Sequence, residues 1–162
     1  APGFRATLFP EMVREARERG LDVVLDIRGS DLTGSLAHQP TIVKINVNEF
    51  SATFLDEALP EETPTHAMPA ELLERMRAVS AGLGTGLVLT NGAQPALFVE
   101  DGQVREIAPA PVEPVNPIGS GDAVTAGIAA GLHRGGTFRE AIELGLDCAR
   151  RNVLLERPGT IE

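Results

Sequence analysis

The chain has 162 residues, of which 43% are hydrophobic and 23% charged, the composition of a folded globular protein with a core of its own. Its net charge of −9 gives no general attraction to nucleic acids or anionic membranes, so neither is expected as a partner. The single cysteine, Cys148, excludes an intrachain disulfide and a cysteine-based zinc site, and we expect the protein in the reducing cytoplasm.

The predicted elements alternate between helices and short buried strands. In chain order they are a helix over residues 9–20, a strand over 21–27, a loop or short helix over 31–40, a strand over 41–46, a helix over 47–59, a surface loop over 60–69, a helix over 70–84 and a strand over 86–90. Segment 96–109 is predicted as a β-hairpin, because Asp101-Gly102 is a typical two-residue hairpin turn. The chain ends with two predicted helices, from about residue 120 and from Thr137, a candidate N-cap, to about residue 155.

This alternation predicts an α/β fold, a mostly parallel sheet covered by helices, in a single domain over residues 1–162. Right-handed crossovers place the carboxyl ends of parallel strands at one edge, where open α/β sheets bind their ligands. Polar or glycine-rich residues follow the strands at four places: Asp26 and Arg28, Asn46 and Glu49, Thr90 to Gly92, and Gly119 to Asp122. We therefore predict that these four segments meet at one ligand-binding edge.

The segment "NPIGSGDAVTAGIAAGL", residues 116–132, carries the strongest chemical signal. A helix that opens at Gly119-Ser120-Gly121-Asp122 leaves its first N–H groups without partners inside the helix, and its dipole favours an anion there. The glycines let a phosphate approach the main chain, and Asp122 can take a proton from an attacking hydroxyl. From these residues alone, a loop with an N-capping acid and no ligand remains equally open.

The helix after this opening contains interior glycines, Gly127 and Gly131. Each costs about 1 kcal/mol of helix propensity relative to alanine. That cost indicates a helix surface that must approach its neighbour closely, and we expect the neighbour to be the sheet or a nucleotide.

Taken in order, these motifs resemble those of the PfkB (ribokinase-like) carbohydrate kinases. "NPIGSGDAVTAG" resembles the family signature Asp-Thr-x-Gly-Ala-Gly-Asp, "VKINVNEF" resembles Lys-Pro-Asn-x-x-Glu, and "LTNGAQPALF" is similar to Thr-x-Gly-x-x-Gly. "VVLDIRG" and "ERPGT" resemble further family segments. The resemblance covers essentially the whole chain as the C-terminal part of such an enzyme, within it most like the 1-phosphofructokinase and tagatose-6-phosphate kinase type. It implies a three-layer α/β/α fold, here a partial domain, with a mostly parallel sheet and a C-terminal hairpin.

The resemblance also implies the catalytic roles. It makes Asp122 the base for the sugar hydroxyl, and Gly119, Ser120 and Gly121 the anion hole. The implied cofactors are ATP and Mg²⁺, and the implied substrate is a sugar or sugar phosphate. The enzyme would then be a phosphotransferase with an alcohol group as acceptor.

Nucleotide and metal roles follow in the same way. Asn46 and Glu49 would organise Mg²⁺ and the phosphates through water, since Mg²⁺ keeps several waters. Two further pairs would bind the nucleotide, one along its phosphates and ribose and one facing the adenine: Thr90 with Gly92, and Cys148 with Asn152. Asp26 and Arg28 are either substrate contacts or a solvated pair at the end of a strand.

The sequence departs from the family pattern at three positions: Asn116 stands for Asp, Ile45 for Pro and Pro95 for Gly. Members of the family are considerably longer, and the half that precedes this region carries most sugar contacts and a β lid. We therefore expect a fragment completed by an N-terminal half or by a homo-oligomer, so that the isolated chain can be inactive. Two hypotheses result: an ATP-dependent sugar or sugar-phosphate kinase, or a nucleotide-binding fragment or regulatory module without catalysis.

Overall fold

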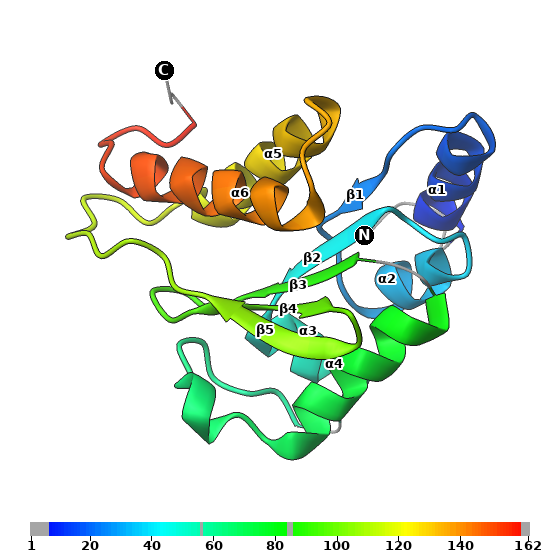
Figure 1. Ribbon diagram of the computed structural model, residues 1–162, viewed down its shortest axis with the longest axis horizontal. Helices are drawn as coiled ribbons and strands as arrows, with labels where there is room; N and C mark the ends of the chain where they lie inside the picture. The colour runs from blue at the N-terminus through cyan, green and yellow to red at the C-terminus, as the bar shows by residue number, and fades with distance from the viewer. Residues whose placement is uncertain (1–6, 56, 84–85, 160–162) are drawn as a thin grey trace. The chain divides into compact units, whose positions relative to one another are not determined.

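The computed structural model describes residues 7–55, 57–83 and 86–159, and the chain forms two compact units, residues 1–106 and 107–162 (Figure 1). The first unit contains α1 (Leu8–Glu18), β1 (Val24–Leu25), α2 (Gly29–Leu36), β2 (Ile42–Asn46), α3 (Val47–Phe54), the 3₁₀ turn η1 (Thr65–Ala67), α4 (Ala70–Leu83), β3 (Gly86–Thr90), β4 (Ala96–Glu100) and β5 (Gln103–Ile107), which reaches the boundary. The second contains α5 (Ser120–His133) and α6 (Phe138–Val153).

The five strands form one sheet in the order β1-β2-β3-β4-β5. Strand β2 pairs in parallel with β1 and β3, whereas β4 runs antiparallel to β3. Strands β4 and β5 are joined at Asp101 and Gly102, whose φ angles of 50° and 69° are the positive values that a type I′ hairpin turn requires. The predicted α/β sheet with parallel strands and a terminal hairpin is confirmed, and the sheet is mixed, because β3, β4 and β5 pair in antiparallel fashion. Strand β1 is shorter than predicted, because only Val24 and Leu25 find partners on β2.

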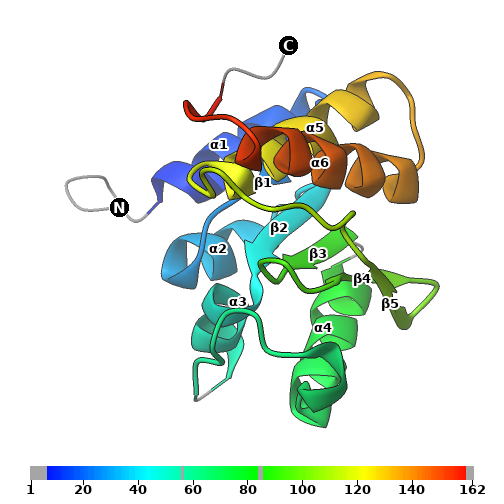
Figure 2. The ribbon, with the colours of Figure 1, turned by 90° about the vertical axis from the view of Figure 1, so that its left-hand side faces the viewer.

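One face of the sheet and helices α1 to α4 enclose the core of the first unit (Figure 2). In β2, Val43 and Ile45 point to this face, as the two-residue period of a strand requires. The helices contribute Val13 from α1, Leu32 and Leu36 from α2, Val47 and Phe50 from α3, and Leu72 and Met76 from α4. The four helices therefore contribute buried apolar side chains to one core that they share with the sheet.

Helix α3 ends at Phe54, five residues before the predicted end at Leu59. Leu59 instead returns to the helix: its N–H donates to Ser51 Oγ at 2.8 Å, and its carbonyl accepts from Asn48 Nδ2 at 2.8 Å. The apolar period predicted a longer helix because Leu59, which is partly buried against the core, stands at a helix-like spacing, although a turn brings it there. Segment 31–40, predicted as a loop or short helix, contains most of helix α2.

Helices α5 and α6 pack closely in the second unit. A Cβ at Gly127 would lie 2.6 Å from the Cα of Gly145, and one at Gly131 would lie 2.7 Å from the Cα of Ala141. These pairs run in opposite directions along the chain, as in an antiparallel helical hairpin. The neighbour that the interior glycines approach is thus α6, where the sequence suggested the sheet or a nucleotide.

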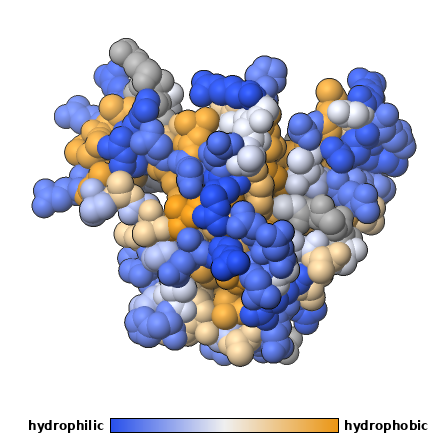
Figure 3. All heavy atoms as spheres, in the orientation of Figure 1, coloured by the Kyte–Doolittle hydropathy of each residue, from blue (hydrophilic) through white to orange (hydrophobic). Residues whose placement is uncertain are grey.

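Polar and apolar side chains are interspersed on the face drawn in Figure 3. Among the described residues of the second unit, the exposed large apolar side chains are Val112, Val115, Ile118 and Leu154. Within the ranges described, no helix has the length and apolar character needed to cross a membrane.

Candidate functional site

In the first unit, the predicted polar residues lie at one edge of the sheet. Asn46 ends β2 and pairs with Thr90, which ends the parallel strand β3. Asp26 directly follows β1, which is parallel to β2. Three of the four predicted segments therefore share the carboxyl edge of this sheet, as the alternation of strands and helices predicted.

Two ion pairs cross this edge. Asp26 Oδ2 lies 3.0 Å from Lys44 Nζ, and Arg28 Nη1 lies 3.3 Å from Glu49 Oε1. The Lys44 side chain is only 5% exposed, and the Asp26 carboxylate is the partner that a buried ammonium group requires. Sequence reasoning gave Lys44 no role, although a lysine inside the apolar run "TIVKIN" signals a charge that needs a buried partner.

Asn46 has a structural task of its own. Its Oδ1 accepts a hydrogen bond from the Glu49 N–H at 2.7 Å and so caps α3. Glu49 then stands in the first turn of the helix with its side chain 25% exposed. No group of three or more metal-ligating His, Cys, Asp or Glu side chains occurs within the described ranges. One carboxylate suits Mg²⁺, which uses one or two carboxylates together with waters and substrate phosphates.

The turn after β3 is built around Gly92, whose φ is +58°. A Cβ there would lie 2.6 Å from Glu62 Cγ, and the Ala93 N–H donates to Glu62 Oε1 at 3.4 Å. Asn91 is buried and its Nδ2 donates to the Thr63 carbonyl at 2.7 Å. The loop before α4 is thus fastened onto the turn, a contact that no local sequence pattern revealed.

In the second unit, α5 opens without a side-chain cap. Its N-cap is Gly119, in the left-handed region at φ +76°. The Ser120 N–H lies 3.3 Å from the Pro117 carbonyl, and its Oγ donates to the same oxygen at 2.6 Å. The N–H groups of Gly119, Gly121 and Asp122 have no acceptor among the described residues. The opening therefore presents the free donors that an anion needs.

Two of these residues, Gly119 and Asp122, line a cavity of about 640 Å³ in the same unit, whereas Ser120 and Gly121 are not among its lining residues. Its walls come from the opening of α5, the facing side of α6 and the segment after α6: Ile118, Gly119, Asp122, Ala123, Ala126, Gly127, Ala130, Cys148, Asn152, Pro158 and Gly159. The volume lies in the range of small-molecule sites. Four predicted site residues, Gly119, Asp122, Cys148 and Asn152, thus line one cavity.

The chain matches the pfkB family of carbohydrate kinases over residues 2–162. It belongs to this family. The PfkB chain is 25% identical over 164 residues to a tagatose-6-phosphate kinase of Staphylococcus epidermidis, with 98% of the chain and 50% of that relative aligned. It is 26% identical over 162 residues to an ATP-dependent 6-phosphofructokinase isozyme 2 of Mycobacterium tuberculosis, with 98% and 44% aligned.

Among solved structures, the PfkB chain is similar to a point mutant of phosphofructokinase-2 from Escherichia coli. The TM-score is 0.81 at 21% identity, and the match covers 97% of this chain and 49% of that one. This likeness confirms the predicted ribokinase-like α/β fold. The chain spans about half the length of the curated relatives it matches, so it accounts for part of the fold that they share.

Asn152 lines the cavity of the PfkB chain with its polar atoms already bound. It is fully buried, its Nδ2 donates to the Ile118 carbonyl at 2.8 Å, and its Oδ1 accepts from the Gly159 N–H at 2.8 Å.

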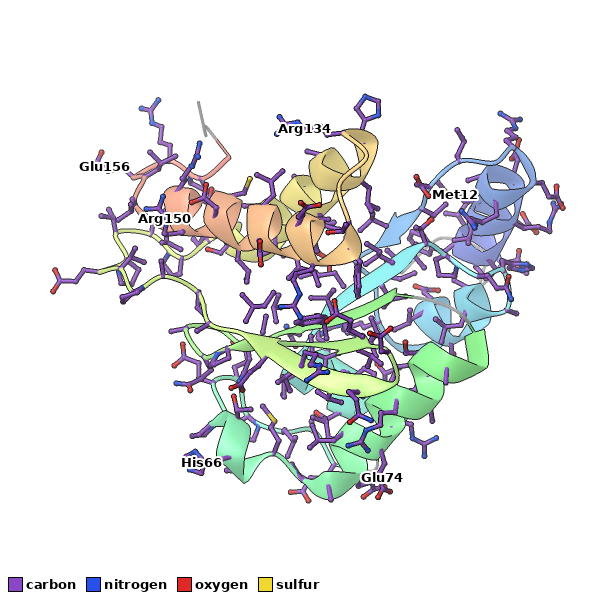
Figure 4. The ribbon with its side chains drawn as sticks, viewed as in Figure 1. Met12, His66, Glu74, Arg134, Arg150 and Glu156 are labelled. Atoms are coloured by element: carbon purple, nitrogen blue, oxygen red, sulfur yellow. The ribbon has the colours of Figure 1, made fainter. Side chains whose placement is uncertain are left out.

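Helix α6 also carries an ion pair outside the cavity wall. Arg150, labelled in Figure 4, donates a hydrogen bond to Asp147 at 2.9 Å. This hydrogen bond holds the pKa of the Asp147 carboxyl below its ordinary value.

Proposed function

We propose that the protein is an ATP-dependent kinase that transfers a phosphoryl group to a hydroxyl of a sugar or sugar phosphate. The observation that carries the proposal is the opening of α5, where Gly119 and Asp122 line a cavity and the N–H groups of Gly119 and Gly121 have no acceptor among the described residues. An acid beside free main-chain donors suits a reaction in which a hydroxyl loses a proton while a phosphate gains negative charge. Membership of the PfkB family supports the same chemistry.

In the proposed reaction, Asp122 accepts the proton of the substrate hydroxyl as its oxygen bonds to the γ-phosphorus. The bond from that phosphorus to the bridging oxygen of ADP breaks, and the electron pair leaves with ADP. The N–H groups of Gly119, Ser120 and Gly121 stabilise the charge on the phosphoryl oxygens. Ser120 can contribute only after its N–H leaves the Pro117 carbonyl, which it now contacts at 3.3 Å.

The first unit is assigned to the nucleotide phosphates and the metal. Glu49 supplies a carboxylate for water-mediated Mg²⁺ binding, and Asn46 fixes Glu49 by capping α3. Mg²⁺ bound there would neutralise phosphate charge. Thr90 and Gly92 would border the phosphates and ribose. Arg28, 70% exposed, and Asp26 are assigned to the substrate or its phosphate.

Cys148 and Asn152 are assigned to the walls of the adenine pocket, because both line the cavity of the second unit. We place the acceptor among phosphosugars, following the names of the relatives, tagatose-6-phosphate kinase and 6-phosphofructokinase isozyme 2. Residues 1–162 then serve as one nucleotide-binding and catalytic domain in the cytoplasm. The remaining sugar contacts would come from a further segment or from a second copy of the chain.

The proposal is tested with the protein at its full natural length. Calorimetric titration with MgATP should show binding, and ADP release should appear with one or more members of a panel of sugars and sugar phosphates. Binding of MgATP without ADP release from any of them would favour the alternative, a nucleotide-binding module without catalysis. If the protein neither binds MgATP nor releases ADP, the assignment of the cavity to the nucleotide is overturned.

A further inference from the structure

Two asparagine side chains hold the peptide groups on either side of Ile118, directly before α5 opens. Asn116 Oδ1 accepts from the Ile118 N–H at 3.0 Å, and Asn152 Nδ2 donates to the Ile118 carbonyl at 2.8 Å. We call Asn116, Ile118 and Asn152 the amide clamp. Because both peptide groups are held, the chain enters Gly119 in a defined direction.

The other end of each asparagine amide binds the segment that follows α6. Asn116 Nδ2 donates to the Glu156 carbonyl at 3.1 Å, and Asn152 Oδ1 accepts from the Gly159 N–H at 2.8 Å; Glu156 is labelled in Figure 4. Each side chain thus uses a donor and an acceptor at once. A carboxylate of the same shape offers only acceptors, so aspartate cannot replace either asparagine without losing a bond.

The clamp bears on the geometry of the free N–H groups. Gly119, the next residue, takes the left-handed conformation at φ +76°, and a Cβ on it would lie 3.3 Å from Pro158 Cβ. Asn152 is fully buried with both polar ends paired, which makes it a rigid support. The direction of the N–H groups after Gly119 is therefore set by residues outside the opening itself.

We propose that Asn116 and Asn152 are positioning residues for phosphoryl transfer, which fix the opening of α5 against the segment 156–159. The inference rests on the proposed function and deepens it. It gives Asn152 a second task beside its place in the cavity wall. Asn116 stands where the family signature has Asp. The proposal gives it a task that only an amide can perform, which is to accept from one peptide group and donate to another. Loss of the clamp should act on kcat, because misdirected N–H groups weaken binding of the transition state more than binding of ATP.

The decisive variant is Asn116→Asp in the full-length protein. It keeps the acceptor for the Ile118 N–H and loses the donor to the Glu156 carbonyl. We expect kcat to fall about 100-fold, as small misplacements of reacting groups do, with KM for MgATP near the wild-type value. Affinity for MgADP with aluminium fluoride, an analogue of the transition state, should fall in parallel with kcat. Asn152→Asp should act in the same direction.

Asn48→Asp is the matched control. Asn48 Nδ2 also donates to a carbonyl, that of Leu59 at 2.8 Å, but it lies in the first unit and outside the clamp. This variant should lose stability and keep kcat. If Asn152→Asp fails to fold, as judged by circular dichroism, Asn116→Asp decides alone.

The possible outcomes distinguish a failure of the clamp proposal from a failure of the kinase proposal. Folded clamp variants with wild-type kcat, or with losses no larger than that of Asn48→Asp, overturn the clamp and leave the kinase proposal standing. A rise in KM for MgATP at constant kcat also overturns the clamp. A wild-type protein that turns over no sugar overturns the proposed function, and the clamp's role with it.

Discussion

Helices α5 and α6 belong to the same unit and begin in opposite ways. At α6, the Thr137 hydroxyl accepts from the Glu140 N–H at 3.3 Å and Glu140 Oε2 accepts from the Thr137 N–H at 2.7 Å, a complete capping box. At α5, the N-cap is Gly119 and no side chain caps the helix. The opening of α6 satisfies two of its N–H donors with its own side chains, whereas the N–H groups of Gly119, Gly121 and Asp122 at the opening of α5 have no acceptor among the described residues.

The difference between the two helix openings indicates that the opening of α6 serves stability and the opening of α5 serves function. A capped opening contributes free energy of folding and offers nothing to a ligand. An uncapped opening forgoes that contribution, and other contacts must hold it, here the amide clamp and the close approach of Gly127 to Gly145. Substitutions at the opening of α5 should therefore reduce activity more than stability, and substitutions at the opening of α6 should do the reverse.

The largest effect is expected for Asp122→Asn. Removal of the base should lower kcat about 1,000-fold, within the usual range for general base catalysis. MgATP binding, measured by calorimetry, should persist because the change keeps the shape of an exposed side chain. Unchanged turnover would show that Asp122 takes no proton.

The second-largest loss of kcat is expected for Gly119→Ala. Alanine at φ +76° costs about 1 kcal/mol or more, and its Cβ would press on Pro158, so the opening should shift and kcat should fall about 10-fold or more. Gly135→Ala is the control, since Gly135 has the same φ of +76° and nothing within 4 Å of its Cβ position. Equal losses of kcat in both variants would show that backbone strain, and not a shift of the α5 opening, causes the loss.

Thr137→Ala should leave kcat unchanged and lower the free energy of unfolding by about 1 kcal/mol, as loss of an N-cap does. Urea denaturation measures the change. Thr137→Ser keeps the hydroxyl and should keep most of the stability. If alanine at 137 instead reduced kcat without changing the urea midpoint, the contrast between the two openings would be wrong.

The smallest effect concerns pH. Hydrogen bonds from the Thr137 N–H and then its hydroxyl lower the pKa of Glu140 below its ordinary value of 4.5. A carboxyl with a lowered folded-state pKa stabilises the fold above its unfolded pKa, and this contribution is lost as pH falls through the folded pKa. The difference in urea midpoint between wild type and Glu140→Gln should therefore shrink on acidification below about pH 4.5. A difference that stays constant would contradict this assignment.

Much of the fold followed from pattern alone. The Asp101-Gly102 turn, the Thr137 cap and the buried strands 42–46 and 86–90 are local features whose residue types and spacing are sufficient. The end of α3 did not follow, because Leu59 returns to the helix through hydrogen bonds to Ser51 and Asn48. The period of apolar residues records burial and cannot distinguish a helix from a turn that buries the same side chain.

For the candidate site, the sequence determined the chemistry: a glycine-rich helix opening, an acid in its first turn and polar residues after the strands. These follow from short-range rules of backbone conformation and from the period of strands. Only the tertiary structure showed that Lys44 pairs with Asp26, that Glu62 packs on Gly92, and that Asn116 and Asn152 clamp Ile118. Apart from the hydrogen bond between Asn116 and Ile118, these contacts join residues far apart in the chain. The spacing of residues along the sequence does not indicate such contacts, because they form only when the chain folds.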